Sequence, residues 1–532
     1  MKRNIKELKE LLGLAKSKRE QQASLIDEAY YYVLPSRQFY IEDEPTDHDD
    51  LFDNTAYEAA VELQTSIINM LIPEARPWAE ISFIKDTLRR EIGPLVVEQL
   101  SESNDYLRDH FVNSNFYLAI GECILDTIVA GTACIAIHDE PFEPLTYECV
   151  PLKQLYFLED KAGNVDCRFR EHKWTTRQLM KRFEDLPEEI TETNPDASHG
   201  VIESVIPDGD QFTYTIHLEN GWHELKNVSM NWSPFVVWRW AKSNNGWGDS
   251  PCLAALPSIR LINKMQMTMI GAGEFAALGA FQTEDESFNS EQAASRLVPG
   301  GIIYTEQPLT PIQFPGNYNI TTDMFERTAM QIRNILLSRG RSTGKNTYKT
   351  ATEIMADREA FIQQVGQPAR RFQDEALKLI ATQVVGRMMK RGEIPPFTDE
   401  HLQIVRNMGF DVSNASEIFT VDVNAAVKQA SMLQQAQNDL MGYANVAQVM
   451  PEETAIHVNK DKLARKLLRG FGVSEDLLNS EETVDAMKEQ ISQMNQTQQT
   501  LGVAGQAGQA GESLNKALDG PLGAALANLN NG

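Results

Sequence analysis

The chain has 532 residues and a formal net charge of −26, with 42% hydrophobic and 23% charged residues. This is enough apolar material for a large folded subunit, while the acidic balance argues against general adhesion to nucleic acid, because most of the surface repels phosphate. Five cysteines without a C-x-x-C pair argue against a disulfide framework or a zinc ribbon and indicate a reducing compartment. The charged N-terminal helix has no signal-peptide core, and the most apolar stretch, 269–281, contains Glu274, so we expect no membrane span.

In the first half of the chain the sequence pattern changes from helical periodicity to short β-rich runs. Residues 53–74 have apolar residues at helical spacing and predict a helix that stops at Pro73. From about 130 to 240, short runs rich in β-branched and aromatic residues alternate with Gly, Asn, Asp and Pro, which predicts a small β-rich part built of hairpins. The "DGD" at 208–210 fits a hairpin turn better than a metal site.

Two long helices are predicted in the middle, at 256–281 and 321–338, with a polar, turn-rich insert at 282–320 between them. Pro257 suits the first turn of the first helix. Asp323 and Glu326 have the spacing of a capping box at the start of the second helix. Gly340 is expected to end that helix, because glycine adopts the left-handed conformation without steric cost.

A short loop, 339–350, follows and carries Arg339, Arg341, Lys345 and Lys349. Thr350 begins the next predicted helix, which Pro368 should kink or break before periodicity resumes over 369–396. One strand is predicted at 417–423. Gln- and Ala-rich helices then fill about 425–495, and the Gly/Gln/Ala/Asn-rich end, 496–532, predicts a flexible tail.

The loop sequence "GRSTGKNT" resembles a phosphate-binding Walker A loop but fails its pattern. Three residues instead of four separate Gly340 from Gly344, Asn346 stands where Ser or Thr would hold magnesium, and helices are predicted on both sides. Asp139 and Glu140 end an apolar strand as a Walker B motif would, although a strand that runs into an acidic turn explains them as well. No H-E-x-x-H or G-x-S-x-G pattern occurs. We therefore expect no enzyme, no metal and no cofactor.

Several segments together resemble the portal (head-to-tail connector) proteins of short-tailed, podovirus-type bacteriophages. They are "YYYVLPSR" (30–37), the stretch 51–81, "CILDTIVAGTACIAIHDE" (123–140) and the stretch 239–265. The order of elements is similar over about residues 20–400. The last 130 or so residues resemble the family only in being helical.

The resemblance implies a mainly α chain with a small β-rich subdomain, an α+β fold, in an elongated subunit that assembles into a ring. Residues 1–255 would form the wing, 256–281 and 321–338 the two stem helices, and 282–320 the clip between them. Residues 339–350 would be the tunnel loop, 351–424 a kinked wing helix and strand, 425–495 the crown and 496–532 the flexible tail. Such rings usually have twelve subunits, here about 718 kDa (12 × 59.8 kDa).

The family resemblance also implies a place and partners. The ring would be made in the host bacterial cytoplasm and sit at one capsid vertex of the virion, as the channel for packaging and ejection of double-stranded DNA. Terminase and then tail adaptor or nozzle proteins would dock on it, beside capsid and scaffolding proteins, with no membrane partner. Within the clip, Glu284, Asp285 and Glu286 are the candidate docking residues.

The basic loop would occupy the position that projects into the channel, which makes Arg339, Arg341, Lys345 and Lys349 candidate DNA contacts. Segment 339–391 carries eleven Lys or Arg against five Asp or Glu, so the surroundings of the loop are basic too. The alternative is an exposed basic turn that pairs with a neighbouring acidic surface. The rival interpretation of the whole chain is another virion structural protein, such as an internal scaffold or DNA-binding protein. A packaging ATPase is the third.

Overall fold

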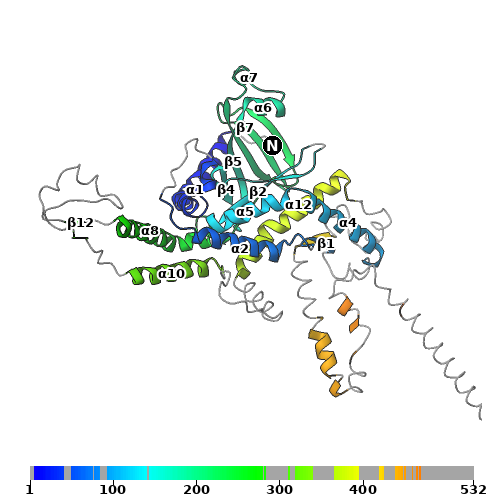
Figure 1. The fold of residues 1–532 in the computed structure, drawn as a ribbon. Helices are drawn as coiled ribbons and strands as arrows, with labels where there is room; N and C mark the ends of the chain where they lie inside the picture. The colour runs from blue at the N-terminus through cyan, green and yellow to red at the C-terminus, as the bar shows by residue number, and fades with distance from the viewer. Residues whose placement is uncertain are drawn as a thin grey trace, which may run out of the picture. The chain divides into compact units, whose positions relative to one another are not determined.

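The computed structural model divides into two compact units, Met1–Lys428 and Gln429–Gly532. Helices and antiparallel sheets together make the first unit an α+β fold, as the sequence predicts (Figure 1). The described residues of the first unit are 5–40, 50–75, 77–83, 93–140, 143–278, 281–282, 310–311, 318–338, 365–394 and 419–423. Those of the second unit are 436, 438–446, 448–450, 458, 463–464, 466–468 and 484.

The first helices pack around one apolar helix, α5. They are α1 (Ile5–Val33), the 3-10 turn η1 (Pro35–Tyr40), α2 (Thr55–Leu71), α4 (Gly93–Asn113) and α5 (Phe116–Ala130). The predicted stop before Pro73 is confirmed, since Ile72 caps α2. α5 is buried along nearly its whole length and ends at Gly131, whose φ of +81° favours glycine. A Cβ on Gly248 would overlap the carbonyl of Gly131, so two backbones meet here without side chains between them.

Strands occupy the region that the sequence predicts as β-rich. One sheet has the order β3 (Thr146–Cys149), β2 (Thr132–His138), β9 (Phe235–Arg239). The second has five antiparallel strands in chain order: β4 (Leu155–Glu159), β5 (Val165–Thr175), β6 (Ser198–Asp208), β7 (Gln211–Leu218) and β8 (Glu224–Met230). The "DGD" is the turn between β6 and β7, with Gly209 at a φ of +64°, so the hairpin interpretation is confirmed.

The long helix α1 contributes to two cores. Its second half belongs to the main core through Ile26, Ala29 and Val33. Its first half packs on the five-stranded sheet in a smaller, separate cluster made by Leu8, Leu12, Ala15, Cys167, Phe169, Ile202 and Ile206. The first half of α1 is therefore held by much less buried apolar surface than the second.

Helices α8 (Pro251–Leu278) and α10 (Tyr318–Ile335) lie side by side and form a helical hairpin (Figure 1). The predicted start near Pro257 is wrong, because Ser250 caps α8 earlier: its Oγ accepts the N–H of Leu253 at 2.9 Å. Pro251 then takes the first helical position, where its missing N–H is not needed. The capping box at Asp323 is wrong as well, since α10 begins at Tyr318 and Asp323 pairs with Arg327 along the helix at 2.9 Å.

The chain after the basic loop is described again from residue 365. Residues 365–372 are helical and continue through a π-helical turn, η4 (Gln373–Leu377), into α12 (Lys378–Arg391). Pro368 does not break this helix, and the irregular turn lies after it. The predicted strand at 417–423 is confirmed as β14 (Phe419–Asp422), which pairs with β1 (Glu80–Phe83).

The described part of the second unit contains helical residues within 438–450 and 463–468. Lys466 Nζ lies 2.7 Å from Asp439 Oδ2 and joins these two stretches. Among the described helices of the whole chain, none has both the length and the apolar character that a bilayer crossing requires.

Candidate functional site

The residues that sequence analysis selects as sites lie outside the described residues. This holds for the basic residues Arg339, Arg341, Lys345 and Lys349 and for the acidic residues Glu284, Asp285 and Glu286. The structure does describe the chain on either side of both segments. These flanking residues show how the fold holds the ends of both segments.

The acidic segment lies between two short strands at the end of the helical hairpin. β12 (Phe281–Gln282) pairs antiparallel with β13 (Thr310–Pro311), with Phe281 opposite Pro311. The chain thus leaves α8 through one strand of a narrow ladder and returns toward α10 through the other. Residues 283–309, between these two strands in the chain, belong to the predicted insert 282–320 and lie outside the described residues.

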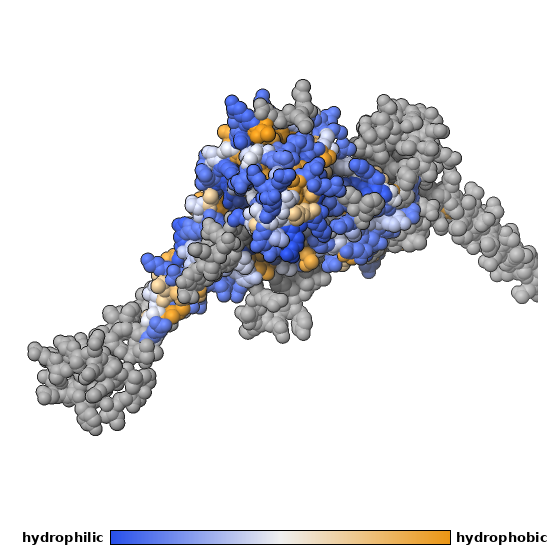
Figure 2. All heavy atoms as spheres, turned by 90° about the horizontal axis from the view of Figure 1, so that it is seen from above, coloured by the Kyte–Doolittle hydropathy of each residue, from blue (hydrophilic) through white to orange (hydrophobic). Residues whose placement is uncertain are grey.

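The hairpin exposes apolar side chains on faces that its own chain leaves uncovered. On α8, Leu261, Met267 and Ile270 are 45%, 53% and 41% exposed, while Ile259 and Ile262 on the same helix are buried. On α10, Met324 and Met330 are also exposed. Figure 2 shows the resulting hydrophobic surface along the projecting part of the molecule. A helix that is apolar on most sides is normally buried on most sides.

The end of α10 determines how the chain enters the basic segment, by which we mean residues 339–364. Ser338 N donates to Arg333 O at 2.8 Å and Leu337 N donates to Asn334 O at 3.2 Å, the two bonds of a Schellman motif. The left-handed residue is Leu337, with a φ of +55°, so the predicted cap at Gly340 is wrong. The hydroxyl of Ser338, which is 6% exposed, donates a hydrogen bond to the carboxylate of Glu62 on α2.

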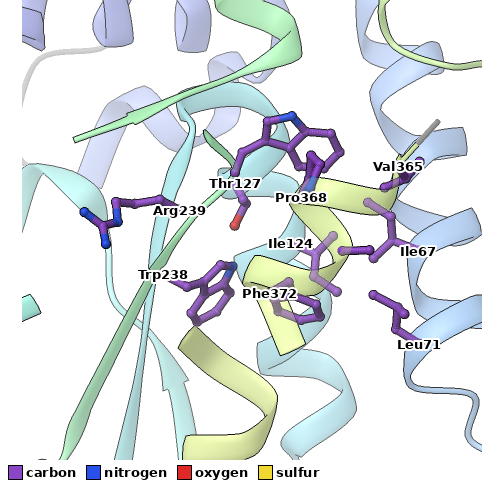
Figure 3. Close-up of a pocket in the computed structure, with 11 residues that line it drawn as sticks. Ile67, Leu71, Ile124, Thr127, Trp238, Arg239, Val365, Pro368 and Phe372 are labelled. Atoms are coloured by element: carbon purple, nitrogen blue, oxygen red, sulfur yellow. The ribbon is translucent and has the colours of Figure 1, made fainter. Parts of the chain in front are cut away.

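The chain returns from the basic segment to the same helix, α2. Val365 and Phe372 lie against a cavity of about 20 Å³, large enough for about one water molecule (Figure 3). The cavity is lined mainly by apolar groups from α2, α5, β9 and residues 365–372: Ile67, Leu71, Ile124, Thr127, Trp238, Arg239, Trp240, Val365, Pro368, Ala369 and Phe372. The residue before segment 339–364 is therefore hydrogen-bonded to α2, and the residue after it lines a cavity together with α2.

Arg239, at the edge of this cavity, joins the helix after the basic segment to the β-rich part. Its side chain is 1% exposed, and Nη2 donates to Glu375 Oε1 at 3.0 Å and to Gly163 O at 2.9 Å. Nη1 donates to Gly246 O at 3.0 Å and to the carboxylate of Glu159. The backbone N–H of Arg239 also donates to Glu375 Oε2, at 3.1 Å. Glu375 belongs to the π-helical turn η4.

Two more cations extend this buried ion pair into a chain of alternating charges. Arg371 Nη1 lies 2.8 Å from Glu375 Oε1, and Lys242 Nζ lies 3.0 Å from Glu159 Oε1. The order is Arg371, Glu375, Arg239, Glu159, Lys242. In this order each carboxylate lies between two cations. A charge that is removed from water is costly unless it is paired and hydrogen-bonded in this way.

A second buried network ties the N-terminal segment to α5. Asp126 accepts hydrogen bonds from Arg37 Nη1 at 2.7 Å, Tyr30 OH at 3.1 Å and Cys149 Sγ at 3.3 Å. Burial raises the pKa of Asp126 to about 6, although the positive charge of Arg37 opposes that shift. The hydrogen bond with Cys123 lowers the pKa of Cys149, but burial and the negative charge of Asp126 raise it, and the net shift is upward. The thiol is therefore a poor nucleophile.

The two acids that could have served as a Walker B motif are held in ion pairs. Asp139 accepts hydrogen bonds from Arg391 and lies 3.7 Å from Arg387 Nε. Glu140 accepts from Arg182. These pairs join the end of β2 to α12 and to α6 (Thr176–Arg182), which agrees with the interpretation of a strand that runs into an acidic turn. Among the described residues, no group of His, Cys, Asp and Glu is arranged to hold a metal ion.

Sequence reasoning did not identify Glu62, Arg239 or Glu375. The one available signal was Arg239 itself, a single charge between two tryptophans in the apolar run "PFVVWRW". A buried strand tolerates such a charge only where acidic partners exist, but nothing local indicates that they lie 80 and 136 residues away.

The described geometry is an α+β fold in which helices α8 and α10 form a hairpin beside the two sheets. Residues 5–478 match the model of the family described as bacteriophage head to tail connecting protein, and the chain belongs to this family. The resemblance found in the sequence is thereby confirmed. Such a connector is a component of the virion and associates with capsid and tail. Comparison with curated proteins gives no match.

Replacement of Arg239 by Met is expected to lower the free energy of unfolding by about 3 kcal/mol, because it leaves two largely buried carboxylates with one cation each. Chemical or thermal unfolding of the full chain measures this. Arg177→Met is the matched control, since the Arg177–Asp196 pair is 74% and 78% exposed and should contribute little. Equal effects of the two substitutions would contradict the role assigned to Arg239.

Proposed function

We propose that this protein is the subunit of a phage portal ring, with twelve copies around a channel for double-stranded DNA at one capsid vertex. The observation that supports a ring best is the apolar surface of α8, which its own chain leaves exposed at Leu261, Met267 and Ile270. Contact between different faces of identical subunits closes into a ring when the rotation between copies allows it. In this proposal α8 and α10 are the stem, and the insertion at their tip is the clip.

The role proposed is structural and contains no catalytic step. The ring would hold the DNA channel open, while terminase would dock during packaging and tail adaptor proteins afterwards. An acidic ring suits a channel that must let DNA pass, because a wall rich in Lys and Arg would bind phosphate tightly. Twelve copies would carry a formal charge of about −312 (12 × −26).

The purified protein is expected to form a ring of about 718 kDa (12 × 59.8 kDa), seen by native mass measurement and by electron microscopy as a particle with a central hole. Met267→Glu should weaken this assembly, because it puts a charge on the apolar face of α8. Leu14→Glu, at a residue that is 59% exposed on α1, is the control. A monomer of the unsubstituted protein that hydrolyses ATP would refute the portal and favour a packaging motor.

We propose that the basic segment contacts DNA locally, within a channel whose wall is otherwise acidic. In the chain its cations, Arg339, Arg341, Lys345 and Lys349, stand between the end of the second stem helix and residue 365. Ser338 before them is bonded to α2, and Val365 after them lines a cavity with α2. Cations concentrated in one loop can centre the duplex or resist slippage through contacts with phosphates, without holding the whole genome.

Replacing these four cations by Gln is expected to leave ring assembly intact and to reduce the yield of DNA-filled heads. The physical reason is the loss of phosphate contacts while the described fold is unchanged. DNA content of purified heads measures the effect. Gln substitution of Lys173 and Lys226, two cations of the β-rich part, is the control for a general change of charge. Normal DNA filling in the four-fold variant would refute this role of the loop.

The acidic clip residues Glu284, Asp285 and Glu286 are proposed to bind partners. Reversal of all three to Lys should weaken docking of terminase or of the tail adaptor, because charges at a rim steer association and select partners. Pull-down of each partner by the assembled ring measures this, and reversal of Glu188 and Glu189 on α7 (Glu188–Thr191) is the control. Unchanged packaging and tail attachment would remove the idea.

A further inference from the structure

Helix α2 is bonded to the helical hairpin at two places. One is the Ser338–Glu62 hydrogen bond in the middle of α2, and the other lies just before the start of α2. The side chain of Asn263 on α8 donates from Nδ2 to Asp50 O at 2.8 Å and accepts at Oδ1 from Phe52 N at 2.7 Å. This bond pair holds the chain just ahead of α2 against α8. Farther along, Gln64 donates to Gly121 O of α5 at 2.7 Å. α2 is thus bound to α8 and to α5, which makes it a firm support for a third element.

That third element is the end of α10. Ala329, Ile332 and Leu336 are buried in the main core, so the last turns of α10 are held by packing. The next residue, Leu337, has the left-handed backbone that costs a branched or bulky L-residue roughly 1–2 kcal/mol. A surrounding contact must hold this conformation, because a non-glycine residue adopts it only where the structure enforces it.

The hydrogen bond from Ser338 to Glu62 is in position to hold the left-handed conformation of Leu337. It joins the residue directly after Leu337 to the middle of α2, and it lies directly before Arg339, the first cation of the basic segment. The Glu62 carboxylate is the acceptor of this hydrogen bond, and hydrogen bonds to carboxylates are stronger than those to neutral acceptors.

We propose that Glu62 is a positioning residue: through Ser338 it fixes the direction in which the chain leaves α10 for the basic segment. The return border supports this, since Val365 lines the same cavity as Ile67 and Leu71 of that helix. Residues 62 and 71 of a helix are about 14 Å apart along its axis, so α2 sets the base of the segment at both ends. The functional part of the proposal rests on the DNA-contacting role proposed for the segment.

Hydrogen exchange of the assembled full-length protein tests the positioning itself. Glu62→Ala and Ser338→Ala should each raise the exchange rate of a peptide covering 332–338 by about tenfold, the loss of about 1.4 kcal/mol that one charge-assisted hydrogen bond contributes. Glu62→Gln should stay within about threefold of the original protein, because the amide oxygen still accepts from Ser338. Glu58→Ala, one turn earlier on an exposed face of α2, should change nothing. Unchanged exchange in Glu62→Ala, or equal exchange in Glu62→Gln and Glu62→Ala, would overturn the proposal.

DNA filling of heads tests whether the positioning serves the channel. Glu62→Ala and Ser338→Ala should lower the yield of DNA-filled heads by about tenfold, while Glu62→Gln and Glu58→Ala should not. The four-fold Gln variant of the loop separates the two ideas. If that variant fills heads normally, the DNA role of the segment fails. If it is impaired while Glu62→Ala fills heads normally, the positioning by Glu62 does not serve DNA filling, and that part of the proposal fails.

Discussion

One buried guanidinium constrains much of the first unit. Arg239 has almost no contact with water, so its donors must find acceptors inside the protein. Two of those acceptors are backbone carbonyls in turns, at Gly163 and Gly246, and two are carboxylates, from β4 and from η4. Strand β9, both turns and the helix after the basic segment must therefore hold their relative places for any of them to be stable.

The π-helical turn is best understood from this constraint. A π-helical turn inserts one residue into a helix and is rare unless something compensates for it. Here Glu375 lies inside that turn and meets both the side chain and the backbone N–H of Arg239. The helix gives up regular hydrogen bonding over Gln373–Leu377 and gains a fully paired buried charge, while α12 resumes the regular helix up to Gly392. Glu375 is therefore fixed from two sides, by the turn and by Arg239.

What the sequence could predict depends on the range of the forces involved. Periodicity and turn residues act locally, and they were enough to predict four features. These are the α+β class, the end of α2 before Pro73, the hairpin at Gly209 and the strand β14. The helix starts and ends near Pro257, Asp323 and Gly340 were wrong because other caps compete with them. Ser250 offers an earlier start than Pro257. At the other end, α10 closes with a Schellman motif at Leu337, before the chain reaches Gly340.

The buried pairs were beyond sequence reasoning for another reason. Glu62 and Ser338 are separated by 276 positions, and Arg239 and Glu375 by 136, so no local spacing could relate them. Only the fold brings them together. The family resemblance, in contrast, depended on the order of many weak segments, and that kind of signal survives without knowledge of any single contact.

The root of the helical hairpin has a mechanical consequence. Gly248 and Gly131 meet backbone to backbone, and two residues later the hydroxyl of Ser250, the cap of α8, donates to Val129 O on α5 at 2.8 Å. Because no side chain fits between these two backbones, any larger residue at either glycine would push the start of α8 away from α5. The distance between the hairpin and the body of the subunit is therefore set by the absence of two side chains, and the Ser250–Val129 bond forms only at that distance.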